Sequence, residues 1–337
     1  MERIQMAYKH PLKGPSGVVI AGAGMTGAYL YRLLSLQGEK VDIYDTSNRS
    51  ACGLSPCAWG TSVGFYELVA KCGLLPEDYL LQRPGYVWMN NYKISADLMT
   101  FDKPRLIEDL LGGARIHRKP LDVSRYTRVI DATGTSRAFL PPIENDLLLP
   151  CIQYKVKTPH HFENRIHLRG VGYAWCFPLS QTEYHMGCGN LRESPYQLLR
   201  STGWFNHQKL KTVCGCTAKI RLTGAKQAQP FVSKAEPLEI WGVGEAVGCV
   251  APLAGDGIVP GMRSVQIVLR NWNNPEAYTE EMLREFAWME KERRVVDKLL
   301  TGRNPGPSDA RILKANSRRM GMHIRSKDAI ALLKHLR

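Results

Sequence analysis

The chain has 337 residues, of which 44% are hydrophobic and 23% charged, and its formal net charge is +14. This length and apolar content favour two closely packed domains and exclude a disordered or fibrous protein. No apolar stretch of about 18 residues is present, and Met1–Pro15 is polar and basic, so we expect neither a membrane span nor a secretion signal. We expect a cytoplasmic protein whose nine cysteines are reduced thiols.

Residues 18–45 predict a strand, a glycine turn, a helix and a second strand. Its three glycines follow the G-x-G-x-x-G pattern, in which they allow a tight turn, close approach of a pyrophosphate and close packing of helix on strand. A helix over 25–37 would aim its free N–H groups at the phosphates, and Asp45 would accept hydrogen bonds from a ribose. The predicted cofactor residues here are Gly22, Gly24, Met25, Thr26, Gly27 and Asp45.

The next part of the chain mixes loops, helices and strands. Residues 46–60 are rich in Ser, Cys, Gly and Pro and predict a loop that leads into a helix. After it we expect helices over 61–72 and 102–111, a hairpin over 86–94 and a buried strand over 128–131 that runs into the turn Ala132, Thr133 and Gly134.

Between residues 148 and 224 the pattern changes to short strands, which suits an antiparallel sheet. The predicted strands are 151–156, 166–168, 172–177, 183–189 and 219–222, with a helix over 195–202. The aromatic run Tyr173–Pro178 either lines a pocket for an apolar ligand or packs a sheet face on a helix.

The last third returns to the parallel-sheet pattern over 239–246, followed by a glycine-rich turn and a helix over 259–272. Helical patterns over 275–300 and 308–336 complete the chain. Residues 291–337 carry thirteen Lys and Arg against four Asp and Glu. Such a region either binds an anionic surface, for example a membrane, or forms a solvated helical face. We expect no nucleic-acid partner.

Three separated segments, at residues 22–45, 173–178 and 244–258, together resemble flavoproteins of the p-hydroxybenzoate-hydroxylase type and, more narrowly, the geranylgeranyl reductase family. The run Tyr173–Pro178 is similar to that family's Y-x-W-x-F-P signature, and the Ala-Thr-Gly turn is similar to one beside the cofactor in flavoproteins. Glu245 and Leu179 stand where the family commonly has Asp and Lys. The resemblance adds these cofactor residues: Cys52, Gly53, Ala132, Thr133, Gly134, Gly244, Glu245, Pro252, Gly255, Asp256, Gly257 and Ile258.

The resemblance implies an α/β fold with a Rossmann-type FAD-binding domain over 1–135 and 236–275. It places an antiparallel-sheet substrate domain at 136–235, joined by elements near 80–100, and a basic helical region at 276–337. The helix after Gly257 would direct its positive end at a reduced flavin ring.

The implied activity is reduction of carbon–carbon double bonds in an isoprenoid lipid, with FAD as cofactor and NADPH, ferredoxin or a deazaflavin as electron donor. Hydride would reach one carbon and a proton the other, in a dry apolar cavity. The predicted substrate residues are Tyr173, Trp175, Phe177 and Pro178, and the predicted catalytic residues are Cys52, Cys57, Tyr173 and Trp175. An electron-donor protein and an anionic membrane surface are the expected partners.

Two other activities stay open. Cys52 and Cys57 form a C-x-x-x-x-C pair where flavin disulfide reductases hold their redox dithiol, although a second nucleotide-binding glycine motif is absent from the sequence. A flavin monooxygenase or halogenase would use the same fold. We expect no metal site, because the C-x-C pair at 214–216 lacks a matching second pair.

Overall fold

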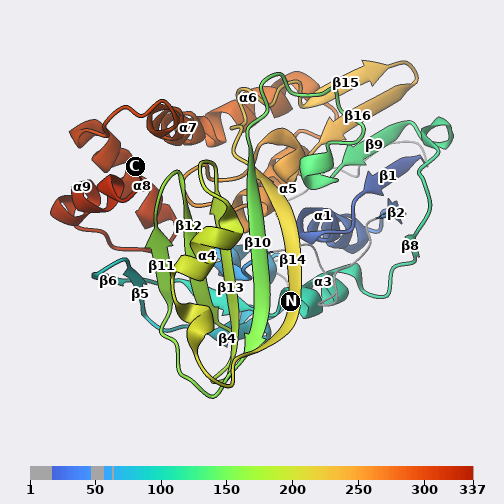
Figure 1. Cartoon of the computed structure of the whole chain (residues 1–337). Coiled ribbons are helices and arrows are strands. Elements are labelled where there is room, and N and C mark those ends of the chain that lie inside the picture. Colours follow the sequence, from blue (N-terminus) through green and yellow to red (C-terminus); the bar gives the residue numbers. More distant parts are fainter. Residues whose placement is uncertain (1–16, 47–56, 63, 337) are drawn as a thin grey trace.

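A computed structural model of the chain describes residues 17–46, 57–62 and 64–336, and it contains two large β-sheets flanked by helices (Figure 1). The first sheet has the strand order β15-β16-β9-β1-β2-β8. Its neighbours pair in parallel, except that β15 and β16 form an antiparallel hairpin. Its strands are β1 (Val18–Ala21), β2 (Asp42–Tyr44), β8 (Ile116–His117), β9 (Arg128–Asp131), β15 (Val232–Ala235) and β16 (Leu238–Gly242).

Both faces of this sheet are covered, as the apolar runs of its central strands predict. Ile20 and Ile130 belong to a core shared with α1 (Met25–Leu36), α3 (Lys103–Leu111) and α5 (Ile258–Arg270). Val19 and Val129 face the opposite side, where they join a smaller cluster. The predicted parallel unit of strand, glycine turn, helix and strand is therefore confirmed.

The second sheet has seven strands in the order β14-β10-β13-β12-β11-β5-β6, and only β5 and β11 pair in parallel. α4 (Pro195–Ser201) lies across one face of it (Figure 1). The strands are β5 (Tyr86–Met89), β6 (Tyr92–Ser95), β10 (Leu148–Lys157), β11 (Arg165–Leu168), β12 (Gly172–Pro178), β13 (Glu183–Asn190) and β14 (Lys211–Arg221).

The side chains of β12 alternate between two environments, as the period of a strand requires. Ala174 and Cys176 pack with α4, while Tyr173, Trp175 and Phe177 point to the other face of the sheet. One face of this run therefore packs on a helix and the other lines a cavity, and an apolar ligand in that cavity stays a prediction.

A third, small sheet consists of β3 (Gly60–Thr61), β4 (Leu80–Gln82) and β7 (Met99–Phe101), next to α2 (Gly64–Ala70). The sequence did not predict it, because strands of two or three residues are too short to show alternation. The two-residue β8 was missed for the same reason. β15 was also missed, whereas β16, which pairs with β9 in parallel, confirms the strand expected from residue 239. β14 extends eight residues further back than its predicted start at 219, since small and polar residues hide the pattern of this exposed edge strand.

The C-terminal region packs on the β5–β6 side of the second sheet. It contains α6 (Pro275–Glu285), α7 (Ala287–Leu300), α8 (Pro307–Arg319) and α9 (Ser326–Lys334), where the sequence indicated two longer helical segments. Phe286 separates the first two because its buried ring joins the core, and Gly321, with φ +69°, follows the end of α8. Among the described residues, no helix is both long and apolar enough to span a bilayer.

Docking of α9 can be tested with two leucine-sized side chains on the same helix. Leu332 is fully buried in the core shared with β5 and β6, whereas Ile330 is 45% exposed. We expect Leu332→Ala to lower the free energy of unfolding by about 2 to 5 kcal/mol in urea titrations, and Ile330→Ala to leave it nearly unchanged. Equal effects of the two substitutions would contradict this packing.

Candidate functional site

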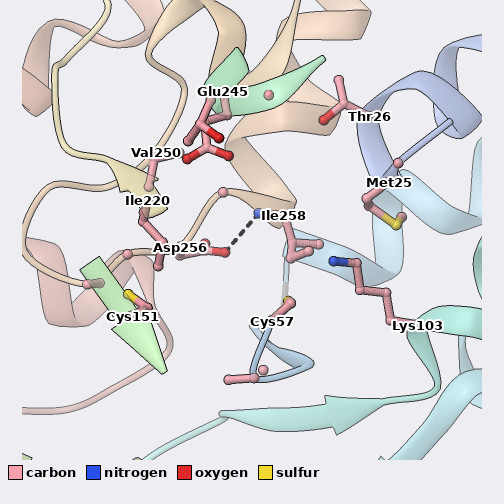
Figure 2. A pocket seen from close by; sticks show the side chains of 18 of the residues that line it. Met25, Thr26, Cys57, Lys103, Cys151, Ile220, Glu245, Val250, Asp256 and Ile258 are labelled. Atoms are coloured by element: carbon pink, nitrogen blue, oxygen red, sulfur yellow. Dashed lines mark hydrogen bonds between the residues drawn. The ribbon is translucent and has the colours of Figure 1, made fainter. Parts of the chain in front are cut away.

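A cavity of about 1030 Å³ lies between the two large sheets and the C-terminal helices. Its walls bring together residues from almost the whole described chain, from Ala21 at the end of β1 to Leu336 after α9. Figure 2 shows the middle of this cavity, with Met25 at one side, Glu245 and Asp256 at another, and Cys57 facing them.

The glycine turn after β1 forms one end of the cavity. A Cβ on Gly22, whose φ is +103°, would lie 2.4 Å from the carbonyl oxygen of Ala132, and a Cβ on Gly27 would lie 1.9 Å from that of Gly22. A Cβ on Gly24 would meet no atom within 4 Å and would project into the cavity. The first and third glycines thus permit close packing, while the second leaves room for a ligand above the start of α1.

Asp45 stands beside this turn, and cations surround it. Its Oδ2 accepts the Ala23 N–H at 3.2 Å and lies 3.6 Å from the Arg118 guanidinium, which also donates to the Asp45 carbonyl. Arg118 and Lys119 line the cavity. The sequence analysis missed these two cations, although the basic run after β8 was the available signal. They suit an anionic group at the helix N-terminus.

The turn after β9 is fixed by Asp131, which is fully buried. Its carboxylate accepts the Thr133 N–H and hydroxyl as well as the N–H groups of Phe139 and Leu140. This exposes Ala132, Thr133 and Gly134 to the cavity, as predicted for a segment beside a cofactor.

The predicted second cofactor segment lies next to the first. A Cβ on Gly244, whose φ is +65°, would lie 2.7 Å from the Thr26 hydroxyl, so only glycine lets this turn approach the start of α1. Gly244 itself is buried, and the neighbouring Glu245 faces the cavity.

Arg221, at the end of β14, holds the turn after β9 and the segment at Glu245 together, and the sequence did not predict it. The side chain is 2% exposed, and its guanidinium donates to the carbonyls of Gly134, Thr135 and Glu245 and to the Asp146 carboxylate. The Arg221 N–H also donates to Glu245 Oε1 at 2.7 Å. Desolvation raises the pKa of the Glu245 carboxyl, and these contacts oppose that shift. No local pattern distinguishes Arg221 from the many surface arginines.

The glycine-rich turn before α5 forms the middle of the wall. Gly255, Asp256, Gly257 and Ile258 line the cavity. Asp256 Oδ1 accepts the Ile258 N–H at 3.0 Å (Figure 2), and burial raises the pKa of this carboxyl to about 6. The first N–H groups of α5 therefore point toward the same space as those of α1.

The aromatic wall lies opposite this turn. Tyr173, Trp175 and Phe177 line the cavity. The Tyr173 hydroxyl donates to the Ala254 carbonyl, and burial raises its pKa. Trp175 Nε1 donates to Gln153 Oε1 at 3.3 Å, so both polar atoms are engaged within the protein and the rings present apolar surface.

Two thiols face the cavity. Cys57 is a free cysteine whose carbonyl accepts a hydrogen bond from Gln153 Nε2 at 3.0 Å. Cys151 was not predicted, and burial raises the pKa of its thiol to about 12. Cys52 and Gly53 lie outside the described residues, so their predicted places beside the cofactor stay predictions.

The far end of the cavity is apolar and was not predicted. It lies between the second sheet and helices α8 and α9, and we call it the apolar arm. Its lining residues include Met89, Leu98, Ile166, Leu168, Leu313, Met320, Met322, Ile324 and Leu336, together with Asn316. Four predicted site residues do not line the cavity, because they are buried behind its surface: Gly27, Gly244, Pro252 and Pro178.

The contrast between two glycines of the first turn gives a stability test. Gly27→Ala would force a methyl group against the Gly22 carbonyl, so we expect it to lower the free energy of unfolding by about 1 to 3 kcal/mol or more. Gly24→Ala meets open space and should leave stability nearly unchanged. Thermal or urea unfolding of the two variants measures the difference, and a neutral Gly27→Ala would contradict the packing described.

No family model matches the chain. A protein of Methanocaldococcus jannaschii described as uncharacterized is 26% identical over 336 residues, which cover 83% of this chain and 91% of that protein.

Two solved structures place the fold. A geranylgeranyl bacteriochlorophyll reductase-like protein from Thermoplasma acidophilum matches 94% of this chain and 90% of its own, with a TM-score of 0.64 and 16% identity. A probable FAD-dependent monooxygenase from Pseudomonas aeruginosa matches 88% of this chain and 99% of its own, with a TM-score of 0.59 and 16% identity. The chain has the α/β fold that these flavoproteins share, and the resemblance predicted from the sequence is confirmed at the level of the fold.

Proposed function

We propose that this chain is an FAD-dependent oxidoreductase that reduces carbon–carbon double bonds of an isoprenoid lipid. The observation that carries the proposal is the continuity of one cavity, which joins a glycine-rich, cationic end to the apolar arm. An extended dinucleotide and an apolar chain would meet inside it, near the turn before α5. The fold likeness and the Y-x-W-x-F-P signature support the same assignment.

FAD fits the described residues. The space above Gly24 and the N-terminus of α1 suit the pyrophosphate, and Asp45 suits the adenosine ribose. Glu245 and the 132–134 turn would lie along the middle of the cofactor, and the Gly255–Ile258 turn near its reactive ring. When bound and reduced, FAD supplies a hydride.

The protein's own part in the reaction is to position the lipid, exclude water and deliver a proton. Tyr173, Trp175 and Phe177 would hold an apolar chain against the Gly255–Ile258 turn, because the polar atoms of the first two are engaged elsewhere. Positioning would contribute most to the rate, because an alkene carries little charge that the protein could stabilise. The proton would come from Cys57, or from Cys52 if it lies nearby as the family likeness implies.

Two alternative activities share this cavity. Cys57 lines it, which favours a thiol–disulfide oxidoreductase if Cys52 lies within reach. The likeness to the probable monooxygenase favours oxygen chemistry on an apolar substrate. NADPH, ferredoxin and a deazaflavin are the candidate electron donors.

Anaerobic reoxidation of the reduced flavin tests the proposed function. We expect purified protein to be yellow, and a geranylgeranyl lipid to restore the oxidised flavin spectrum while the lipid gains two hydrogen atoms per double bond. A disulfide that reoxidises the flavin, with loss of this effect in Cys57→Ala, would instead support the dithiol activity. Hydroxylated product that forms only with oxygen would support a monooxygenase, and protein that takes up no FAD would overturn all three.

We also propose that α8 and α9 touch an anionic membrane that holds the lipid. Arg311 and Arg318 are exposed on α8, and Lys327 and Lys334 are exposed on α9, three and four residues from the exposed Ile330. We expect binding to phosphatidylserine vesicles that weakens as salt rises and is lost when these four cations are changed to Glu. Lys211→Glu with Lys219→Glu, on the distant β14, is the control, and equal losses in both variants would overturn the proposal.

A further inference from the structure

Glu292, in the middle of α7, is a fully buried carboxyl that connects three parts of the chain. Its Oε1 accepts a hydrogen bond from Asn316 Nδ2 of α8 at 2.9 Å and lies 3.5 Å from the Arg319 guanidinium. Its Oε2 accepts the backbone N–H of Leu253 at 3.4 Å. Burial raises the pKa of this carboxyl to about 7, although all three donors favour its charged form.

Two of the hydrogen-bond partners of Glu292, Leu253 and Asn316, belong to different ends of the cavity. Leu253 lies in the turn that leads to Asp256 and α5, where the reactive ring of FAD would lie. Asn316 is 2% exposed and lines the apolar arm beside Leu313. Glu292 itself stands behind the wall, so it touches neither ligand site but joins them.

A carboxylate at this place makes folding less favourable. A buried ionisable group loses its hydration, and an apolar side chain of similar volume commonly packs at no loss of stability. What an apolar residue cannot do is accept hydrogen bonds from a backbone N–H and an amide together. The Ala254 carbonyl, one residue along the same turn, is held from the other side by the Tyr173 hydroxyl. The turn is therefore fixed by two side chains, both attached to walls of the substrate end.

We propose that Glu292 is a positioning residue that links occupancy of the apolar arm to the cofactor turn. An apolar ligand in the arm would displace the Asn316 side chain. The Glu292 carboxylate, which Asn316 and Leu253 share, would pass this displacement to the Leu253 N–H. The inference rests on the proposed function, since it places FAD at that turn. By linkage, an apolar ligand and FAD must then change each other's affinity by the same factor, and we expect this factor to favour binding because the occupied arm would hold the turn in place.

The test measures the dissociation constant of FAD for the apoprotein, by flavin fluorescence, with and without saturating geranylgeraniol. Hexadecanol serves as a saturated probe. For the wild-type chain we expect each alcohol to tighten FAD binding at least about fivefold. Glu292→Gln places an amide NH2 against donor groups, so the factor should fall to near one. Glu290→Gln, on the same helix and next to the exposed Lys226, should keep the wild-type factor.

A swapped pair separates positioning from simple loss of structure. In Glu292→Gln with Asn316→Asp, the new amide can donate to the new carboxylate and still accept the Leu253 N–H, so the coupling should return. Thermal unfolding midpoints of all variants identify any that fail to fold.

Full coupling in Glu292→Gln, no coupling in the wild-type chain, or no recovery in a folded swapped pair would overturn the inference. Coupling by both alcohols without any reoxidation of reduced flavin by a prenyl lipid would overturn the proposed function and leave this inference standing. Reoxidation without coupling would do the reverse.

Discussion

The structure depends on how closely the start of α1 approaches the second glycine segment. Thr26 occupies the space between Gly244 and Gly261, where added Cβ atoms would lie 2.7 and 2.5 Å from its hydroxyl oxygen. A larger residue at Gly261 would push α5 away from α1, and one at Gly244 would push away the turn that follows β16. Two segments more than 200 residues apart are thereby held at one distance, and the cavity between them keeps one width.

A second constraint acts from the opposite side. The Arg221 guanidinium satisfies carbonyls of the turn after β9 and of the segment at Glu245, and Asp146 balances its charge. A buried arginine with several acceptors is costly to disturb, because losing it would leave those acceptors and the carboxylate without partners. Arg221 also ends β14, so the edge of the second sheet is tied to the turn after β9 of the first. The contacts of Arg221 therefore shape the cavity between the two sheets as much as Gly244 and Gly261 do.

The sequence predicted what local rules govern. The glycine turn, the parallel strands and the two faces of β12 follow from the backbone needs of glycine and the period of a strand. The apolar arm could not be predicted, because the helical period of α8 and α9 shows that one face is buried but not what covers it. The roles of Arg221 and Glu292 could not be predicted for a similar reason. Their partners lie on other elements, and only burial distinguishes them from the other charged residues.

The charges along the cavity indicate which kind of ligand it suits. Arg118 and Lys119 stand at the dinucleotide end, and the Lys103 ammonium points into its middle (Figure 2). Farther along, burial raises the pKa of both Asp256 and Glu292. A negative charge placed there would raise these pKa values further, so it would either be disfavoured or draw in a proton. The cavity thus matches a ligand that is anionic at one end and uncharged where it meets the apolar arm. A dinucleotide with a neutral ring has that distribution.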